Sequence, residues 1–197
     1  LITLFDGPGR PGLPLAVVGA GTGLGVSGLL PHEGKWLPIQ GEGGHVSLPA
    51  IDDLDYEIVK FLGQELDRVS AERVLSGMGL ENLYRALAAI DGLDVEPKTA
   101  AEVVDGALKD GDTLCLKVLE RFCMFLGGVA GDLVLTLGAF DGVFIGGGIG
   151  PRITEFMKKS ALKERMTAKG RFRDLMNDVP VRLMTAKYPA LIGCAKI

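Results

Sequence analysis

The sequence predicts an α/β domain over residues 1–197. Short apolar runs are typical of strands, longer segments with apolar residues three and four positions apart are typical of helices, and glycine-dense turns separate several of them. Strands mixed with helices give an α/β fold. The chain has 197 residues, of which 47% are hydrophobic, so it can bury a substantial core.

The first elements expected are strands in a hairpin-like arrangement. An apolar run at 15–18 ends in glycine, and a second extended stretch covers 24–30. Turn residues follow at 31–34, and 36–39 then returns as a further strand.

An amphipathic helix is expected from 52 to 68. Its apolar positions, among them Tyr56, Val59 and Leu62, recur at three- and four-residue spacing, which is the period of a helix with one buried face.

A second helix should begin after Ser70, which could cap it, with 71–73 in its first turn. The glycines of 77–79 should separate this helix from another at 80–90.

The middle of the chain predicts a loop at 91–97, a helix at 99–108 and a long buried helix at 112–137. Asp132 and several glycines interrupt the apolar stretch of the long helix. It therefore suits burial in protein rather than in lipid, and its glycines permit close packing; no membrane span is expected.

The last elements begin with a compact strand at 142–145. Pro151 suits the first position of a helix, where its missing N–H has no consequence, so 152–159 should be helical. A last strand is expected at 181–184 and a last helical turn at 189–195.

Composition narrows the range of partners. The net charge is −4 and no basic stretch is concentrated, which argues against nucleic acid or a membrane surface and favours a small ligand. Cys115, Cys123 and Cys194 share no zinc-like spacing with either histidine, so no metal site is expected. Free cysteines behave as small apolar residues and indicate a reducing, cytoplasmic compartment.

Three glycine-dense turns, at 19–25, 41–45 and 146–152, are the most informative feature. A residue without Cβ lets main-chain N–H groups converge on an anion at close range. Each turn follows apolar residues, so together they indicate sites for a phosphorylated ligand and a polar small molecule.

The first turn has two interpretations. Gly21, Thr22 and Gly23 follow a strand, and their N–H groups and the threonine oxygen could hold a terminal phosphate. The alternative is a tight turn between two strands. The turn is no Walker loop, because the lysine of that motif is absent.

Carboxylates and an imidazole accompany the second turn. Glu42 and His45 flank two glycines, an arrangement that suits adjacent sugar hydroxyls, because a carboxylate accepts from two of them and a neutral imidazole both donates and accepts. Alternatively, Glu42 is solvated and His45 caps a strand. Glu72 could bind the same ligand, or its charge could simply be favoured by the dipole of the helix that it begins.

The third turn also has two interpretations. Gly146, Gly147 and Gly148 could admit an adenine and a ribose against bare backbone. They could equally be a sharp connection from a strand to a helix.

These segments resemble the bacterial glucokinase family, the ATP-dependent hexose kinases of the hexokinase, actin and heat-shock chaperone superfamily. The resemblance follows the family's order and covers nearly the whole chain. One glycine turn is unspecific, but the combination is highly specific. The matching segments are 21–26, 41–46, 69–77, 83–85, 142–149 and 151–152.

The resemblance implies a ribonuclease H-like, actin-like ATPase large domain, with a mixed sheet flanked by helices. It implies phosphoryl transfer from ATP, with Mg²⁺, to the 6-hydroxyl of D-glucose. It also assigns ligands to the candidate residues: glucose to Glu42, His45 and Glu72, the ATP phosphates to 21–23, and the adenosine to 146–148.

The sequence departs from the family at its front. Family members begin with a smaller N-terminal domain that carries a first phosphate loop and the aspartate that acts as catalytic base, and neither is found here. We therefore expect the large C-terminal domain alone, with no catalytic residue and little kinase activity. The apolar surface left by a missing domain could drive association, for instance into a homodimer.

Two alternatives stay open at this point. A non-catalytic sugar-sensing domain, attached to or controlling a transcription regulator, could keep the same sugar pocket without the aspartate. A chaperone- or actin-like ATPase would keep the nucleotide turns and would need no pair of Glu and His for hydroxyls.

Overall fold

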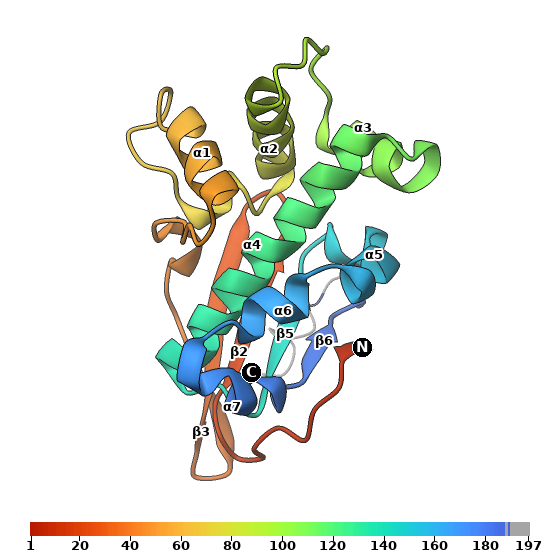
Figure 1. Ribbon diagram of the computed structural model, residues 1–197. Coiled ribbons are helices and arrows are strands. Elements are labelled where there is room, and N and C mark those ends of the chain that lie inside the picture. Colours follow the sequence, from red (N-terminus) through yellow and green to blue (C-terminus); the bar gives the residue numbers. More distant parts are fainter. Residues whose placement is uncertain (188, 190–197) are drawn as a thin grey trace.

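The computed structural model describes residues 1–187 and 189. Its strands form one mixed sheet in the order β1-β6-β5-β2-β3-β4 (Figure 1). β5 runs parallel to β2 and β6, whereas the β1–β6, β2–β3 and β3–β4 pairs are antiparallel. The strands are β1 (Ile2–Phe5), β2 (Leu15–Ala20), β3 (Leu24–His32), β4 (Lys35–Ile39), β5 (Gly142–Gly146) and β6 (Val181–Leu183).

Helices and short helical turns connect and cover the strands, which confirms the α/β class. The helices are α1 (Asp53–Leu62), α2 (Gly77–Ile90), α3 (Ala100–Asp105), α4 (Thr113–Leu137), α5 (Thr154–Lys159), α6 (Leu162–Thr167) and α7 (Arg173–Asn177). The 3-10 turns are η1 (Gly43–His45), η2 (Ala71–Arg73), η4 (Gly150–Arg152) and η5 (Gly170–Phe172), and η3 (Gly106–Asp110) is a short π-helix.

The hairpin-like start is confirmed, with β3 two residues longer than predicted. Glu33 and Gly34 make the β3–β4 turn with φ values of 47° and 76°, the left-handed pair that suits a two-residue hairpin. β1 was not predicted; it pairs with β6 at the far edge of the sheet.

Two predicted boundaries in the helical region are wrong. α1 ends at Leu62 instead of 68, because the chain turns at Gly63 and runs back toward η1. The glycines of 77–79 form the first turn of α2 and do not precede it, since the Ser76 hydroxyl accepts the Gly79 amide at 3.0 Å. The expected helix after Ser70 is only the short turn η2.

The remaining helices agree more closely with the prediction. The long helix is confirmed as α4, and the one at 99–108 as α3 with its extension η3. The segment 152–159 divides into η4, with Pro151 in its first turn, and α5. The predicted turn at 189–195 lies outside the described residues apart from Pro189, as does Cys194.

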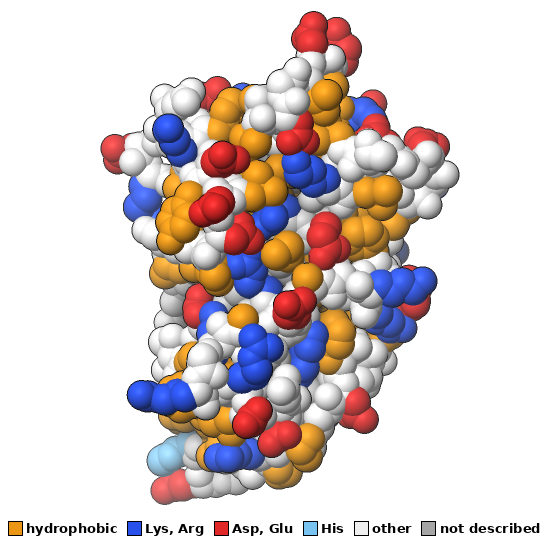
Figure 2. All heavy atoms as spheres, viewed as in Figure 1, with side chains coloured by type: hydrophobic (Ala, Val, Ile, Leu, Met, Phe, Trp, Pro, Cys, Tyr) orange, Lys and Arg blue, Asp and Glu red, His pale blue; other side chains and the backbone are white. Residues whose placement is uncertain are grey.

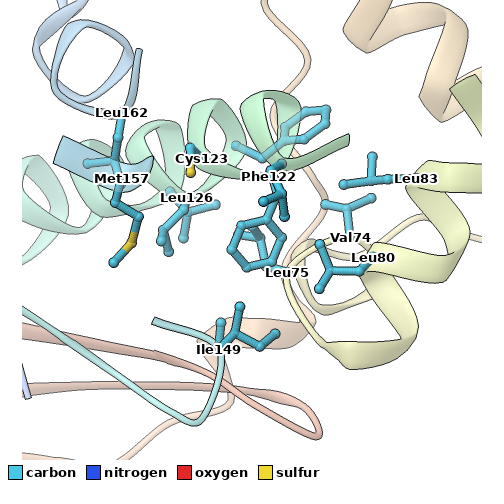
Figure 3. Close-up of a cluster of buried hydrophobic side chains, with 14 of the residues drawn as sticks. Val74, Leu75, Leu80, Leu83, Phe122, Cys123, Leu126, Ile149, Met157 and Leu162 are labelled. Carbon is cyan, nitrogen blue, oxygen red and sulfur yellow. The ribbon is translucent and has the colours of Figure 1, made fainter. Parts of the chain in front are cut away.

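The core forms where α4 packs against its neighbours (Figure 3). Phe122, Cys123 and Leu126 of α4 are at most 1% exposed. α6 lies against α4 because glycine replaces a side chain at the contact: a Cβ at Gly127 or Gly131 would collide with an α6 carbonyl oxygen. Burial raises the pKa of the Cys123 thiol to about 12, so this cysteine is an inert core residue.

Ion pairs fix the start of α1 against α4 and α6. Arg121 on α4 reaches Asp52 and Asp55 at 2.7 Å each. Arg165 on α6 reaches the same two carboxylates at 2.7 and 2.9 Å. The Asp55 side chain is only 1% exposed, and the two guanidinium groups balance the charges of the two carboxylates.

The surface mixes charges of both signs. On the face shown in Figure 2, acidic and basic side chains alternate, and no extended basic patch forms there. Among the described helices, none is both long and apolar enough to cross a membrane.

Candidate functional site

The first and third glycine turns lie side by side at one edge of the sheet. β2 and β5 are parallel, and Gly19 pairs with Gly146, so both strands end at the same level. The turn at 21–23 leaves β2, and the turn at 146–148 leaves β5. A Cβ at Gly147 would collide with the Ala20 carbonyl oxygen, and its φ of 86° also favours glycine.

A cavity of about 290 Å³ opens between these turns. Gly21, Thr22 and Gly148 form one side of it. Within the described residues, the main-chain amides of Thr22 and Gly148 donate to no protein acceptor. Free amides on bare backbone fit an anion such as a phosphate. An adjoining cavity of about 410 Å³ shares Gly148 and extends to Pro151 and Met184.

Glu42, His45 and Glu72 come together beside the first turn. His45 Nε2 lies 4.0 Å from Glu42 Oε2 and 4.0 Å from Glu72 Oε1. Their side chains are 89%, 56% and 30% exposed for Glu42, His45 and Glu72, so the group faces solvent. Two carboxylates and an imidazole at this spacing can bind several hydroxyls of one small molecule.

Main-chain pairing between 45–48 and 68–71, which we call the clasp, brings the three residues together. The Ala71 amide donates to the Val46 carbonyl oxygen at 2.9 Å, and the Leu48 amide to that of Val69 at 3.0 Å. The guanidinium of Arg68 donates to the His45 carbonyl oxygen at 2.6 Å. The clasp thereby holds η1, with Glu42 and His45, against η2, with Glu72.

Glu72 also connects the group formed by Glu42, His45 and Glu72 to the first turn. Its Oε2 accepts the Leu24 amide at 2.8 Å, and a Cβ at Gly23 would collide with the same oxygen. Because η2 has only three residues and Glu72 bonds across to β3, a helix dipole does not account for its position. The other oxygen, Oε1, faces His45 and is available to a ligand.

The glycines of the second turn allow η1 to approach β3. A Cβ at Gly44 would collide with the Leu24 carbonyl oxygen, and one at Gly43 would lie 2.7 Å from the Val26 side chain. Gly41, by contrast, has open space around its Cβ position.

The structure therefore brings three predicted groups of residues to one edge of the sheet. They are the turn at 21–23, the turn at 146–148, and Glu42 with His45 and Glu72. Sequence reasoning gave no role to Arg68 or Arg152, although Arg152 lines the cavity between the turns. Neither has a local sequence signal, because each acts on a residue distant in the chain: Arg68 on His45 and Arg152 on Asp105.

Comparisons with known proteins show to which family the chain is related. The chain is 44% identical over 197 residues to a glucokinase of Cupriavidus metallidurans, covering 100% of this chain and 59% of the relative. It is 47% identical over 195 residues to a glucokinase of Chromobacterium violaceum, covering 99% of this chain and 56% of the relative. The chain thus spans less than two thirds of the relatives it matches.

Solved structures give the same result. The crystal structure of a glucokinase from an Antarctic psychrotroph superposes with a TM-score of 0.92 at 38% identity, covering 98% of this chain and 60% of that one. A glucokinase of Balamuthia mandrillaris in complex with glucose, 20% identical, shares the fold with a TM-score of 0.74, covering 87% of this chain and 50% of that one. The family model described as glucokinase matches residues 1–197, and the chain belongs to the glucokinase family.

Proposed function

We propose that this chain is the large C-terminal domain of an ATP-dependent glucokinase, which transfers a phosphoryl group to the 6-hydroxyl of D-glucose. The observation that carries the proposal is the meeting of Glu42, His45 and Glu72, with His45 4.0 Å from each carboxylate, beside a glycine turn whose Thr22 amide has no acceptor among the described residues. Family membership supports the phosphoryl-transfer reaction. The geometry supports the assignment of the sugar to one group of residues and of the nucleotide to the glycine turns.

Glucose would lie over Glu42, His45 and Glu72. Glu42 and Glu72 each accept sugar hydroxyls, and His45 both donates and accepts. Glu72 is held by the Leu24 amide, so it presents Oε1 in a fixed direction. Fixing the sugar in this way contributes to catalysis by orientation, because a positioned hydroxyl needs no further ordering before it attacks.

The nucleotide would lie between the first and third turns. Gly21, Thr22 and Gly23 would hold phosphates through main-chain amides and the threonine hydroxyl, and 146–148 would lie against the adenosine. ATP supplies the phosphoryl group when bound, with Mg²⁺ held mainly through the phosphates. Glu72 contacts the Leu24 amide beside the first turn and His45 of the sugar site. It would therefore hold the phosphate donor and the sugar acceptor in a fixed position relative to each other.

The catalytic base forms the part of the proposal that lies beyond this chain. We infer that an aspartate of a smaller N-terminal domain takes the proton of the 6-hydroxyl, and that this domain closes over the cleft and excludes water. A reducing, cytoplasmic setting is part of the same proposal, in keeping with the unpaired thiols of Cys115 and Cys123.

Glucose binding tests the proposal directly. The variant Glu42→Ala should weaken glucose binding at least tenfold, the loss expected when a charged hydrogen-bond acceptor is removed, as measured by isothermal titration calorimetry on the 197-residue chain. Its melting temperature should not change, because the Glu42 side chain is 89% exposed.

The matched control is Glu57→Ala, which removes an exposed carboxylate from α1 and should bind glucose like the unmodified chain. Equal glucose affinity of Glu42→Ala and the unmodified chain would contradict the sugar site. A chain that binds adenine nucleotides but no hexose would instead favour the actin- or chaperone-like alternative.

A further inference from the structure

Arg152 closes one side of the cavity between the glycine turns. Its Nη2 lies 3.3 Å from Asp105 Oδ1. Arg152 ends η4 and Asp105 ends α3, so the ion pair joins two rims of the cavity that are 47 residues apart in sequence. The two side chains are 47% and 44% exposed, and a solvated pair of this kind contributes little to folding stability.

Part of the cavity lining is aliphatic and comes from Leu80 of α2 and from Ala100 and Val104 of α3. Thr22 and Gly148 of the glycine turns line the same cavity. The cavity thus combines hydrocarbon, a planar cation and anion-binding amides. A flat aromatic ring that carries phosphates matches this combination.

Arg152 and Lys109 both pair with Asp105, at 3.3 and 3.1 Å, so one positive charge remains in this group. The aliphatic residues of the lining favour an aromatic ring there, and the guanidinium plane stacks readily on aromatic faces.

We propose that Arg152 stacks on the purine base of the bound nucleotide and that Asp105 holds the guanidinium in the stacking orientation. This inference rests on the proposed function, because it takes the cavity to be the nucleotide site. Arg152 is then a specificity-determining residue for the base, while the phosphates bind at the first glycine turn, 21–23.

Calorimetric titrations of the 197-residue chain with ADP and with inorganic tripolyphosphate separate the two kinds of contact. Arg152→Ala should weaken ADP binding roughly tenfold, the size of a desolvated cation–aromatic contact, and leave tripolyphosphate binding unchanged. Arg152→Lys keeps the charge without the flat plane, so it should recover only part of the ADP affinity.

The matched control is Arg171→Ala, which removes an exposed arginine of η5 that lines neither cavity and should leave both titrations unchanged. Unfolding is checked by circular dichroism melts, which should coincide for all variants because Arg152 is half exposed.

Two results would overturn the inference alone. One is unchanged ADP affinity in Arg152→Ala. The other is an equal loss of ADP and tripolyphosphate binding, which would make Arg152 a phosphate contact. An unmodified chain that binds neither ADP nor glucose would overturn the proposed function itself, and this inference with it.

Discussion

At Gly44 the main chain of η1 approaches the Leu24 carbonyl oxygen so closely that no side chain fits between them. Three residues upstream, Gly41 has open space at the same position. One turn therefore contains a glycine required by packing and one that packing does not require. The difference separates a role in shaping the site from mere chain flexibility.

The variant Gly44→Ala should displace η1 from β3 and move Glu42 and His45 away from Glu72. We expect the free energy of unfolding to fall by about 1–3 kcal/mol, as for other overpacked sites, together with a loss of glucose binding. Denaturant unfolding and calorimetry measure the two effects.

Gly41→Ala is the control and should leave the site geometry intact. If Gly44→Ala bound glucose with unchanged affinity, the close approach of η1 to β3 would have no part in forming the sugar site.

At this scale, the sequence predicts residue types better than their partners. Glu42 and His45 are recognisable because both flank a glycine pair, and the structure places them together. The Leu24 amide that orients Glu72 has no side-chain signal, since any residue offers that amide. The contact of Arg68 with the His45 carbonyl oxygen depends on the clasp, which forms only after the chain has folded back.

Among the elements, α4 shows how an N-cap can respond to acid. The Asp112 side chain accepts the Cys115 amide at 3.0 Å and pairs with Lys98 Nζ at 2.7 Å. The hydrogen bond from Lys98, and then that from the Cys115 amide, lower the pKa of Asp112 to about 2. A folded-state pKa below the unfolded value of about 3.9 means that the carboxylate stabilises the fold most fully above pH 4.

This contribution should disappear as the pH falls from about 4 to about 2, because the unfolded chain takes up the proton first. Asp112→Asn can still accept the Cys115 amide but carries no charge for Lys98. We expect a lower free energy of unfolding at pH 6 and a flatter dependence on pH between 4 and 2, measured by urea unfolding. Equal slopes for the variant and the unmodified chain would show that Asp112 is not responsible.

The elements also show where periodicity misleads. The expected apolar face of α1 included Tyr56, which is 59% exposed, whereas Asp55 is buried. An aspartate is buried here only because Arg121 and Arg165 arrive from two other helices to compensate it. Hydrophobic spacing along one helix holds no information about such partners, while α4 was predictable because its burial follows from its own composition.

For the whole molecule, the placement of the turns on one edge was predictable only through the resemblance. Each turn alone also fits a tight connection between two elements. The first and third turns meet only because β2 and β5 are neighbours in the order β6-β5-β2-β3, and a short apolar run does not indicate which strand will lie beside it. Strand β1 escaped prediction because four residues at a sheet edge leave a weak pattern.

The chain as a unit should bind ligands without completing the reaction. We expect the purified 197-residue chain to form glucose 6-phosphate about 10²–10⁴-fold more slowly than full-length relatives, because a general base contributes a factor of this size. A coupled dehydrogenase assay measures this rate, and heat-treated protein gives the background.

Turnover at the level of full-length relatives would mean that a residue within 1–197 acts as the base. It would contradict the proposed division between domains and leave the sugar and nucleotide sites as proposed.

The register of β2 and β5 fixes the spacing between the first and third glycine turns. Gly19 lies in register with Gly146 in the parallel β2–β5 pair, so the sheet sets this spacing before a ligand binds. A donor with a longer or shorter phosphate chain finds no adjustable gap there. Engineering a change of donor should therefore begin at Ala100 and Val104 of α3, which also line the cavity, and leave the turns untouched.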